Sequence, residues 1–389
     1  MNILLITADD FCVEDICETF RFYGHETIYC ECTKEEMLKN NSTTIKGFMT
    51  NNIDIVFTFN YYPSIAIICK EMSVHYISWV YDNPQVHLFS YTAIFPTNTI
   101  YVFEKEVAEY FQSQGINNIY YLPLAANPIR LERMISNAIE KKSEFSKPKD
   151  VSFVGAMYTE KHQLFSRMIE KGISEYTFGY LNGIIKAQKK IYGCDIITPL
   201  LSEDIISEMK KGLPLEPDQD SAVPTEYLFA KYVIDRKITA EERMNLLSLA
   251  GEKHDVHVFT IDPNMDIPNC TNHGPAHSDI DAPTIYNTSK INLNISLRSI
   301  VNGIPLRAFE IMGSGGFLLS NYQAELQDYF IPGEDYDYFE SQEDMVYKID
   351  YYLGHDDIRK QIAINGKKKI EKYHTFFDRV SKMNLSKII

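Results

Sequence analysis

The chain has 389 residues, of which 45% are hydrophobic, and its 38 Lys and Arg against 53 Asp and Glu give a formal net charge of −15. This length predicts two domains, or three, with cores large enough to fold without disulfides. The apolar fraction excludes a disordered protein. The acidic balance argues against nucleic acid or an anionic membrane as the main partner.

The cysteines and the apolar runs indicate the compartment. Seven cysteines, an odd number without the spacing of a zinc or redox motif, are typical of reduced thiols. No apolar stretch approaches the roughly 20 residues that span a bilayer, and no basic region precedes the N-terminal apolar run. We therefore expect a cytoplasmic protein without a signal peptide or integral membrane contact, of undetermined oligomeric state.

The first part of the chain alternates short β-branched runs with helical stretches. This pattern predicts an α/β domain with a mostly parallel sheet. Strands are expected at residues 3–7, 27–30, 53–59, 75–80, 100–103 and 119–122, and helices at 13–23, 66–72 and 105–114.

After a polar linker, a second α/β unit is expected to open with a strand at residues 150–155. A mostly helical middle follows at 176–250, and then a long irregular segment at 262–283, of a length that is usually functional or disordered. Further strands are expected at 256–260, 291–295 and 316–320, and helices at 305–314, 341–353 and 356–372.

Two common functions of such α/β domains do not fit. A phosphorylation receiver needs an aspartate at the end of its third strand, where this chain has Asn60. Dinucleotide binding needs glycines in the first βα turn, and residues 8–12 contain none.

The most informative segment, residues 302–320, reads NGIPLRAFEIMGSGGFLLS. Pro305 suits the first turn of a helix and Asn302 can cap it. A helix N-terminus attracts anions, and Arg307 in the first turn adds donors suited to a diphosphate. Glu310 offers two acceptor oxygens, which match the vicinal hydroxyls of a ribose. An Arg307–Glu310 ion pair beside a glycine-rich turn is the purely structural alternative.

RAFE at residues 307–310, followed by MGSGG at 312–316, resembles the donor-site motif of the CgeB-like group of GT-B glycosyltransferases. The segment YISWVYDNP at 76–84 is similar to the signature of an N-terminal domain of unknown function that is often fused to this module. The other matching segments are SFVG at 152–155, ER at 242–243, YNTSKINLN at 286–294 and YHTF at 373–376 with Arg379. The resemblance covers nearly the whole chain.

The resemblance implies a GT-B architecture, with two Rossmann-like parallel-sheet domains facing across a cleft. The implied parts are an acceptor-side domain at 1–125, a linker at 126–149, a nucleotide-sugar donor domain at 150–370 and a C-terminal helix at 371–389 packing back on the first domain. The implied reaction moves a sugar from a nucleoside diphosphate, UDP or dTDP, to a protein, glycan or small-molecule acceptor. It needs no metal or other cofactor.

By the same resemblance, Glu310 binds the donor ribose and Arg307 binds the diphosphate. Gly155 allows close approach of the first loop of the donor domain, and Tyr286 belongs to the donor site. Retaining GT-B enzymes carry two glutamates separated by seven residues, and the first of these positions is Asn302 here. The stereochemistry is therefore undecided.

Asp82 is the candidate for the base that activates the acceptor. It follows a predicted buried strand, so it is expected at the carboxyl edge of the sheet, where ligands of open α/β folds bind. The alternative is a structural role for Asp82 in an Asp-Asn-Pro turn. Nearby Trp79, the one tryptophan, is either a core residue or a platform for sugar stacking.

Further donor-site candidates are Arg298 and Lys161 for phosphate, and His277 with His273 for base, phosphate or sugar. The alternative for the histidines is a solvated loop. Together with these histidines, Asp279 and Asp281 could form a metal-binding motif. We do not assign a metal to it, because the expected site stabilises the diphosphate with a helix dipole and Arg or Lys in place of a metal ion.

Two other functions remain open from the sequence. A nucleotide-sugar epimerase on the same scaffold would interconvert the free donor without an acceptor. A catalytically silent sugar- or nucleotide-binding component of a surface or spore assembly would release no nucleotide at all.

Overall fold

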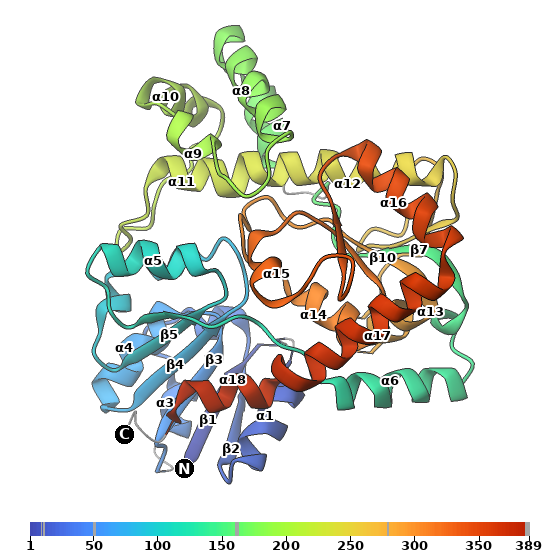
Figure 1. Ribbon diagram of the computed structural model, residues 1–389. Helices are drawn as coiled ribbons and strands as arrows, with labels where there is room; N and C mark the ends of the chain where they lie inside the picture. Colours follow the sequence, from blue (N-terminus) through green and yellow to red (C-terminus); the bar gives the residue numbers. More distant parts are fainter. Residues whose placement is uncertain (9, 11, 50–51, 160–162, 278–279, 386–389) are drawn as a thin grey trace. The chain divides into compact units, whose positions relative to one another are not determined.

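The computed structural model describes the chain except residues 9, 11, 50–51, 160–162, 278–279 and 386–389. The chain divides into two compact units (Figure 1). The first contains Met1–Ala125, Asp218–Val223 and His374–Ile389, and the second contains Ala126–Pro217 and Pro224–Tyr373. Each unit is built on a six-stranded parallel sheet, which confirms the predicted α/β class. None of the helices in the described ranges is both long and apolar enough to span a bilayer.

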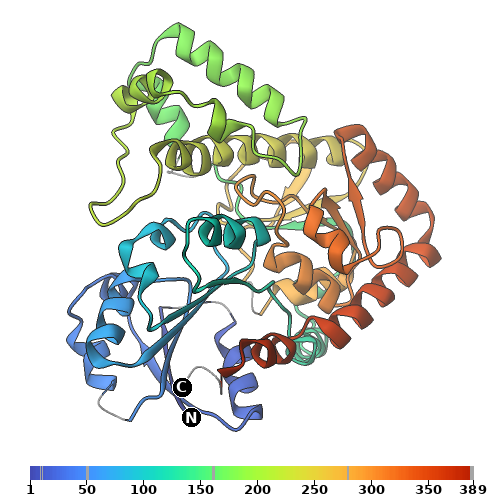
Figure 2. The ribbon, with the colours of Figure 1, turned by 60° about the vertical axis from the view of Figure 1, so that its left-hand side comes forward.

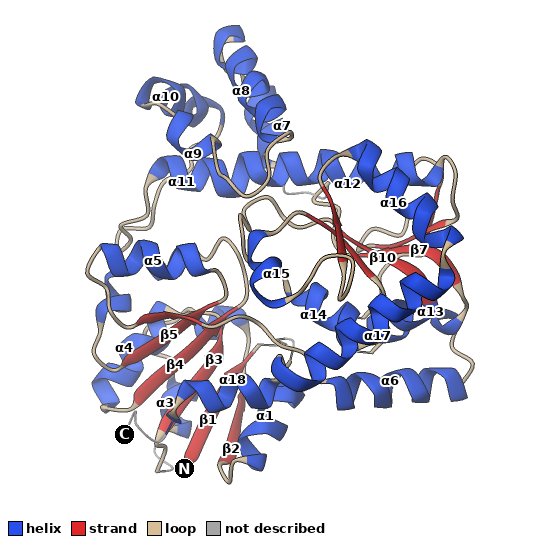
Figure 3. Ribbon diagram, in the orientation of Figure 1, coloured by secondary structure: helices blue, strands red, loops and turns tan. Residues whose placement is uncertain are grey.

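The sheet of the first unit has the strand order β2-β1-β3-β4-β5-β6 (Figure 3). Strand β1 lies between β2 and β3, so the direction in which strands are added reverses there. The carboxyl ends of β1 and β3 therefore form the topological switch point of this sheet. The strands are β1 (Asn2–Thr7), β2 (Glu26–Glu31), β3 (Ile55–Phe59), β4 (His75–Val80), β5 (Asn98–Val102) and β6 (Ile119–Tyr121).

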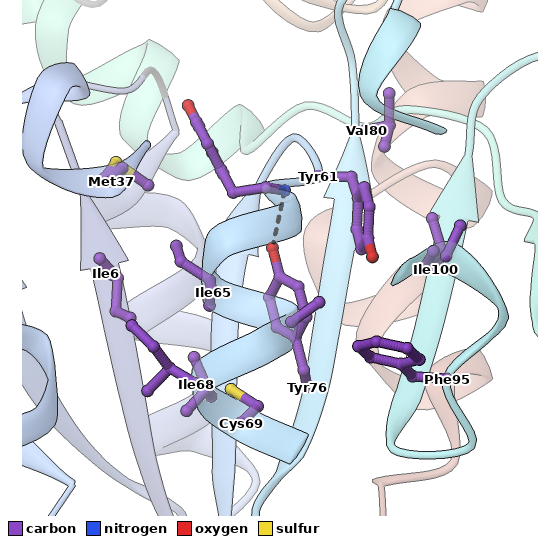
Figure 4. Packing of buried hydrophobic residues seen from close by; sticks show 14 of the residues in the cluster. Ile6, Met37, Tyr61, Ile65, Ile68, Cys69, Tyr76, Val80, Phe95 and Ile100 are labelled. Atoms are coloured by element: carbon purple, nitrogen blue, oxygen red, sulfur yellow. Dashed lines mark hydrogen bonds between the residues drawn. The ribbon is translucent and has the colours of Figure 1, made fainter. Parts of the chain in front are cut away.

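Alternate residues of these strands serve opposite faces of the sheet, as a period of two requires. Leu4 and Ile6 belong to the core beneath α4, which Figure 4 shows from close by. In this core, the Tyr76 hydroxyl accepts a hydrogen bond from the backbone N–H of Tyr62 at 3.2 Å. The helices of the unit are α1 (Val13–Phe22), α2 (Lys34–Met37), α3 (Thr43–Phe48), α4 (Pro63–Met72), α5 (Lys105–Ser113) and α18 (Phe376–Met383), with 3-10 turns η1 (Val86–Phe89) and η2 (Tyr91–Ile94).

The opposite face carries aromatic residues that pack against α1 and α18. Phe20 of α1 meets Phe57 edge to face at 5.3 Å, and Phe376 of α18 lies 5.6 Å from Trp79. Trp79 is 1% exposed, and its indole N–H donates to the carbonyl of Leu122 at 3.3 Å. Trp79 is therefore a core residue and not an exposed stacking platform.

Two later segments of the chain complete the first unit. In α18, Arg379 is buried and donates to the carbonyls of Pro123 at 2.8 Å and Leu124 at 3.1 Å. Residues 218–223 join through Asp220, whose carboxylate accepts from the Ser90 hydroxyl at 3.0 Å. The sequence had placed this acidic segment inside the second domain.

The sheet of the second unit has the order β12-β11-β10-β7-β8-β9. Its first strand, β7, lies between β8 and β10, so the switch point falls at the carboxyl ends of β7 and β10. The strands are β7 (Lys149–Val154), β8 (Val256–Phe259), β9 (Cys270–Asn272), β10 (Ser289–Asn294), β11 (Leu318–Asn321) and β12 (Asp337–Phe339).

Within the second unit, helices α7 to α10 lie on the side of α12 away from β7 and β10 (Figures 1 and 2). They have an apolar cluster of their own around Phe165, Met168 and Leu181. The helices are α6 (Pro128–Glu140), α7 (Leu164–Glu170), α8 (Glu175–Gln188), α9 (Ile197–Leu200), α10 (Glu203–Gly212), α11 (Thr225–Leu228), α12 (Asp235–Gly251), α13 (Ala282–Thr288), α14 (Leu306–Gly313), α15 (Ala324–Tyr329), α16 (Gln342–Gly354) and α17 (Asp356–Tyr373), with a 3-10 turn η3 (Glu144–Ser146) and a π-helix η4 (Phe229–Ile234).

Candidate functional site

The switch point of the second sheet gathers most of the predicted donor-site residues. Strands β7 and β10 are paired in parallel, with Ile291 opposite Val151 and Asn292 opposite Ser152. Gly155 directly follows β7. In open α/β sheets such a switch point leaves a crevice between the diverging loops, and ligands bind there.

Arg307 points to this edge of the sheet from the first turn of α14. Its Nη1 donates to Oδ1 of Asn294, the last residue of β10, at 3.2 Å. The guanidinium carbon lies 5.2 Å from the ring centre of Phe153 in β7. The guanidinium therefore sits where β7 and β10 end, with a planar set of donors suited to phosphate oxygens.

Gly155 leaves the space that Arg307 occupies. A Cβ atom at residue 155 would lie only 2.5 Å from Nη2 of Arg307 and 3.3 Å from the ring of Phe153. The absence of a side chain thus lets the guanidinium approach the backbone of the loop after β7. The role of Gly155 in donor binding, which the resemblance implies, stays a prediction.

Tyr286 and Glu310 adjoin Arg307. The Tyr286 hydroxyl lies close enough to the Arg307 guanidinium for the positive charge to act on it. Burial raises the pKa of Tyr286, the charge of Glu310 adds to this rise, and Arg307 opposes it. The phenol therefore stays neutral at physiological pH. Glu310 is 7% exposed, one turn beyond Arg307 on α14. The structure thus brings together Gly155, Tyr286, Arg307 and Glu310.

Arg243 of α12 is a second arginine of this edge, and our sequence interpretation gave it no role. It is 2% exposed, and its Nε donates to the carbonyl of Ile295 after β10 at 3.0 Å. Its Nη1 donates to the carbonyl of Ala156 after β7. Arg243 therefore ties together the two loops of the switch point. The only signal in the sequence was its place in the ER motif at residues 242–243.

Arg298 lies just beyond β10, but an ion pair engages its guanidinium. Its Nε donates to Oε2 of Glu242 at 2.7 Å, and its Nη1 donates to the carbonyl of Ile191 at 2.8 Å. The ring of Tyr192 covers its other face at 3.9 Å. Contact between Arg298 and a phosphate stays a prediction, and it requires this ion pair to open.

The two histidines of the irregular segment, His273 and His277, have different surroundings. His277 is exposed, and its backbone N–H donates to Asp281 at 2.9 Å just before α13. His273 stacks on Phe259 at the end of β8, with ring centres 4.7 Å apart. Lys161 and Asp279 lie outside the described residues. The residues that the structure describes contain no group of three or more His, Cys, Asp or Glu able to hold a metal ion.

The expected cap of α14 is wrong. The helix begins at Leu306, and its N-cap is Pro305, which has no side-chain cap hydrogen bond. Pro305 takes the extended conformation, with ψ at 150°, so Asn302 lies too far ahead to cap the helix. The Asn302 carbonyl instead accepts from the backbone N–H of Glu325 at 3.1 Å.

Asp82 lies at the carboxyl edge of the first sheet, two residues beyond β4. Its Oδ2 accepts a hydrogen bond from Nδ2 of Asn60 at 2.8 Å, and its N–H donates to Oδ1 of Asn60 at 3.1 Å. The carboxyl group keeps contact with solvent, but the surrounding loops desolvate it in part. This desolvation raises the pKa of Asp82 and Asp10 adds to the rise, whereas Asn60 and Lys34 oppose it.

Part of the chain matches the model of a known protein family. Residues 240–384, which include Arg243, Arg307 and Glu310, match a family model described as glycosyl transferase-like. No curated protein sequence matches the chain.

Solved structures that are similar over the whole chain share its fold. Sucrose-phosphate synthase from Thermosynechococcus elongatus has a TM-score of 0.57 at 8% identity, over 100% of this chain and 98% of that one. Anabaena Alr3699/HepE, solved in complex with UDP and glucose, has 0.52 at 9%, over 100% of both chains. A UDP-forming trehalose-phosphate synthase from Burkholderia vietnamiensis has 0.53 at 8%, over 100% and 97%.

The chain therefore has the GT-B fold, with a Rossmann-like sheet in each unit. The glycosyl transferase-like match of residues 240–384 supports the expected class of enzyme, a glycosyltransferase. The CgeB-like subfamily and its N-terminal domain stay predictions.

Proposed function

We propose that this protein is a CgeB-like glycosyltransferase that moves a hexose from a UDP-sugar to a protein or glycan acceptor in the cytoplasm. The observation that carries the proposal is the position of Arg307, at the switch point of the second sheet and against Gly155. The match of residues 240–384 to a glycosyl transferase-like model supports it. Nothing in the comparisons supports the epimerase alternative.

The donor is held by α14 and the loop after β7 in this proposal. Arg307 and the N-terminus of α14 bind the diphosphate, because both present N–H donors and positive charge. Glu310 accepts hydrogen bonds from the ribose hydroxyls, and Tyr286 orients Arg307. The choice of UDP over dTDP rests on the complexes of Alr3699/HepE with UDP and with UDP-glucose.

Transfer requires stabilisation of the leaving diphosphate and activation of the acceptor hydroxyl. Arg307 and the helix N-terminus carry the first task without a metal ion. Asp82 carries the second in an inverting reaction, and Asn60 orients its carboxylate. His277 and Arg298 are secondary donor contacts in this scheme, with Arg298 released from Glu242 when the donor binds.

Calorimetric titration with UDP, dTDP, GDP, CDP and ADP without added metal tests the donor site. We expect selective micromolar binding of UDP. Arg307→Gln should weaken it about 10- to 100-fold, because a charge-assisted hydrogen bond contributes roughly 1.5–3 kcal/mol. Arg167→Gln, on the exposed side of α7, is the matched control and should bind UDP normally. Equal UDP affinity of both variants and the parent chain would overturn the site.

Release of UDP from UDP-glucose separates the three functions. A transferase releases UDP only when an acceptor is present. An epimerase converts the free donor without releasing UDP, and a silent binding component does neither. Conversion of UDP-glucose to another UDP-sugar in the absence of acceptor would contradict the proposed transfer.

A further inference from the structure

Two arginines at the carboxyl edge of the second sheet have partners of different charge. Arg298 donates from Nε to Oε2 of Glu242 at 2.7 Å, and from Nη2 to the other carboxylate oxygen. Arg307 donates from Nη1 to the amide oxygen of Asn294 at 3.2 Å, and among the described residues it forms no ion pair. A carboxylate cancels the charge of the guanidinium that it binds, whereas an amide oxygen is a neutral acceptor. Arg307 is therefore held in place with its charge uncancelled.

Two serines fix the orientation of the Asn294 amide. Asn294 is the last residue of β10, fully buried, and it lies opposite Ser320 of β11. Its Nδ2 donates to the Oγ of Ser320 at 2.9 Å and to the Oγ of Ser296 at 3.1 Å. A reversed amide would place its N–H groups against those of the guanidinium. The network therefore keeps the amide oxygen of Asn294 turned toward Arg307.

The ends of β10 and β11 hold this network in turn. The backbone N–H of Ser296 donates to Oδ1 of Asn321, the last residue of β11, at 2.8 Å. Nδ2 of Asn321 donates to the carbonyl of Tyr322 at 3.1 Å. Ser296 and Asn321 are both buried. Buried polar networks of this kind make the side chains that they contain rigid. The position of the Arg307 guanidinium is therefore set by the two strand ends.

The neutrality of the acceptor matters for the binding of an anion. A carboxylate at residue 294 would compete with a phosphate, because both are anions that accept hydrogen bonds from the same guanidinium. Arg298 illustrates this competition, since its ion pair with Glu242 must open before it can bind a phosphate. The amide oxygen of Asn294 fixes the direction of one N–H of Arg307 and leaves the positive charge to the ligand.

We propose that Asn294 is a positioning residue of the donor site. Its neutral amide oxygen orients the guanidinium of Arg307 toward the diphosphate without cancelling its charge, and Ser296 and Ser320 hold the amide in the orientation that this requires. The inference rests on the proposed function, because Asn294 acts on the diphosphate only through Arg307.

Asn294→Asp tests the neutrality of the acceptor. The two side chains have nearly the same shape, and the hydroxyls of Ser296 and Ser320 can turn to donate to the new carboxylate, so the variant should fold. Calorimetry should show UDP affinity at least about tenfold below that of the parent chain, because the carboxylate forms a charge-assisted hydrogen bond with Arg307. Asn137→Asp, exposed on α6, changes the net charge equally and should bind UDP like the parent.

A double-mutant cycle with Asn294→Ala tests whether Asn294 acts through Arg307. In the parent chain, Asn294→Ala should weaken UDP binding about 3- to 10-fold, because the guanidinium loses the acceptor that orients it. In a chain that already carries Arg307→Gln, the same substitution should change UDP affinity less than about twofold, since the two residues act as one unit. A purely structural role of Asn294 would produce the same loss in both chains.

The same titrations separate failure of this inference from failure of the proposed function. Parent-like UDP affinity in both Asn294 variants, together with weakened binding in Arg307→Gln, would overturn the role of Asn294 and leave the donor site intact. Equal losses from Asn294→Ala in both chains would also overturn that role. Parent-like UDP affinity in Arg307→Gln would overturn the donor site itself, and the role of Asn294 with it. Circular dichroism of each variant shows whether it is folded.

Discussion

The carboxyl edges of the two sheets carry opposite charges. After β4 in the first unit stands the carboxylate of Asp82, held by Asn60 with Asp10 nearby. At the switch point of the second unit stand the guanidinium groups of Arg307 and Arg243. A cationic edge suits a diphosphate, and a carboxylate edge with a raised pKa suits the removal of a proton. In the proposed reaction, the second edge holds the diphosphate and the first edge supplies the proton acceptor.

Asp82→Asn is the variant from which we expect the largest effect on activity. The amide cannot accept the proton, so we expect UDP release in the presence of acceptor to fall about 10²- to 10⁴-fold, the usual contribution of a general base. UDP affinity should be unchanged. Asp54→Asn, just before β3 at the opposite edge of the sheet, is the control and should keep its activity. A similar loss in both variants would show a structural effect.

Arg243→Met tests whether the site at the carboxyl edge of the second sheet depends on the buried hydrogen bonds of Arg243. The substitution leaves the carbonyls of Ala156 and Ile295 without their donor, so the free energy of unfolding should fall by about 3 kcal/mol. Chemical denaturation measures this loss. UDP affinity should fall as well, since the loops after β7 and β10 are no longer tied together. A variant with full stability would show that these hydrogen bonds are dispensable.

Gly155→Ala changes the space at the same edge without changing its charge. The new methyl group would displace the guanidinium of Arg307, and the φ of 157° at this position disfavours an L side chain, so the free energy of unfolding should fall by about 1 kcal/mol or more. UDP affinity should fall about 3- to 10-fold, because a misplaced donor loses part of a charge-assisted hydrogen bond. Gly172→Ala, where φ is also positive and a Cβ meets no atom within 4 Å, is the matched control. Equal UDP affinity in both variants would mean that Arg307 binds from another position.

The sequence was most informative where a pattern is local. The strand periodicity placed β1, β4 and β10 within two residues of their ends, and the RAFE motif located α14. Strands β9 (CTN) and β12 (DYF) were missed because each is three residues long and includes a polar residue, whereas the equally short β6 (IYY) continues into Leu122 as one apolar run. The attachment of residues 218–223 to the first unit depends on contacts distant in the sequence, such as that of Asp220 with Ser90.

The candidate site was predictable only in part, for the same reason. Arg307 and Glu310 share one helix, so their spacing carried information. The hydrogen bonds of Arg243 join α12 to loops about 50 and 90 residues away in the sequence. No local sequence pattern predicts contacts over such distances. Arg298 looked equivalent to Arg307 because the sequence does not reveal its ion pair with Glu242.

The pH dependence of the transfer rate tests the role of Asp82 as the base through the smallest of the expected effects. Because desolvation raises the pKa of Asp82, the base becomes active only at a higher pH than an ordinary aspartate, and the transfer rate should rise with pH through that raised pKa. Asp10→Asn removes the neighbouring negative charge, which adds to this rise. The acidic limb of the rate profile should therefore move to lower pH, while UDP affinity at neutral pH stays constant. A shift to higher pH would place the proton acceptor elsewhere, because only a group repelled by Asp10 gains acidity when that charge is removed.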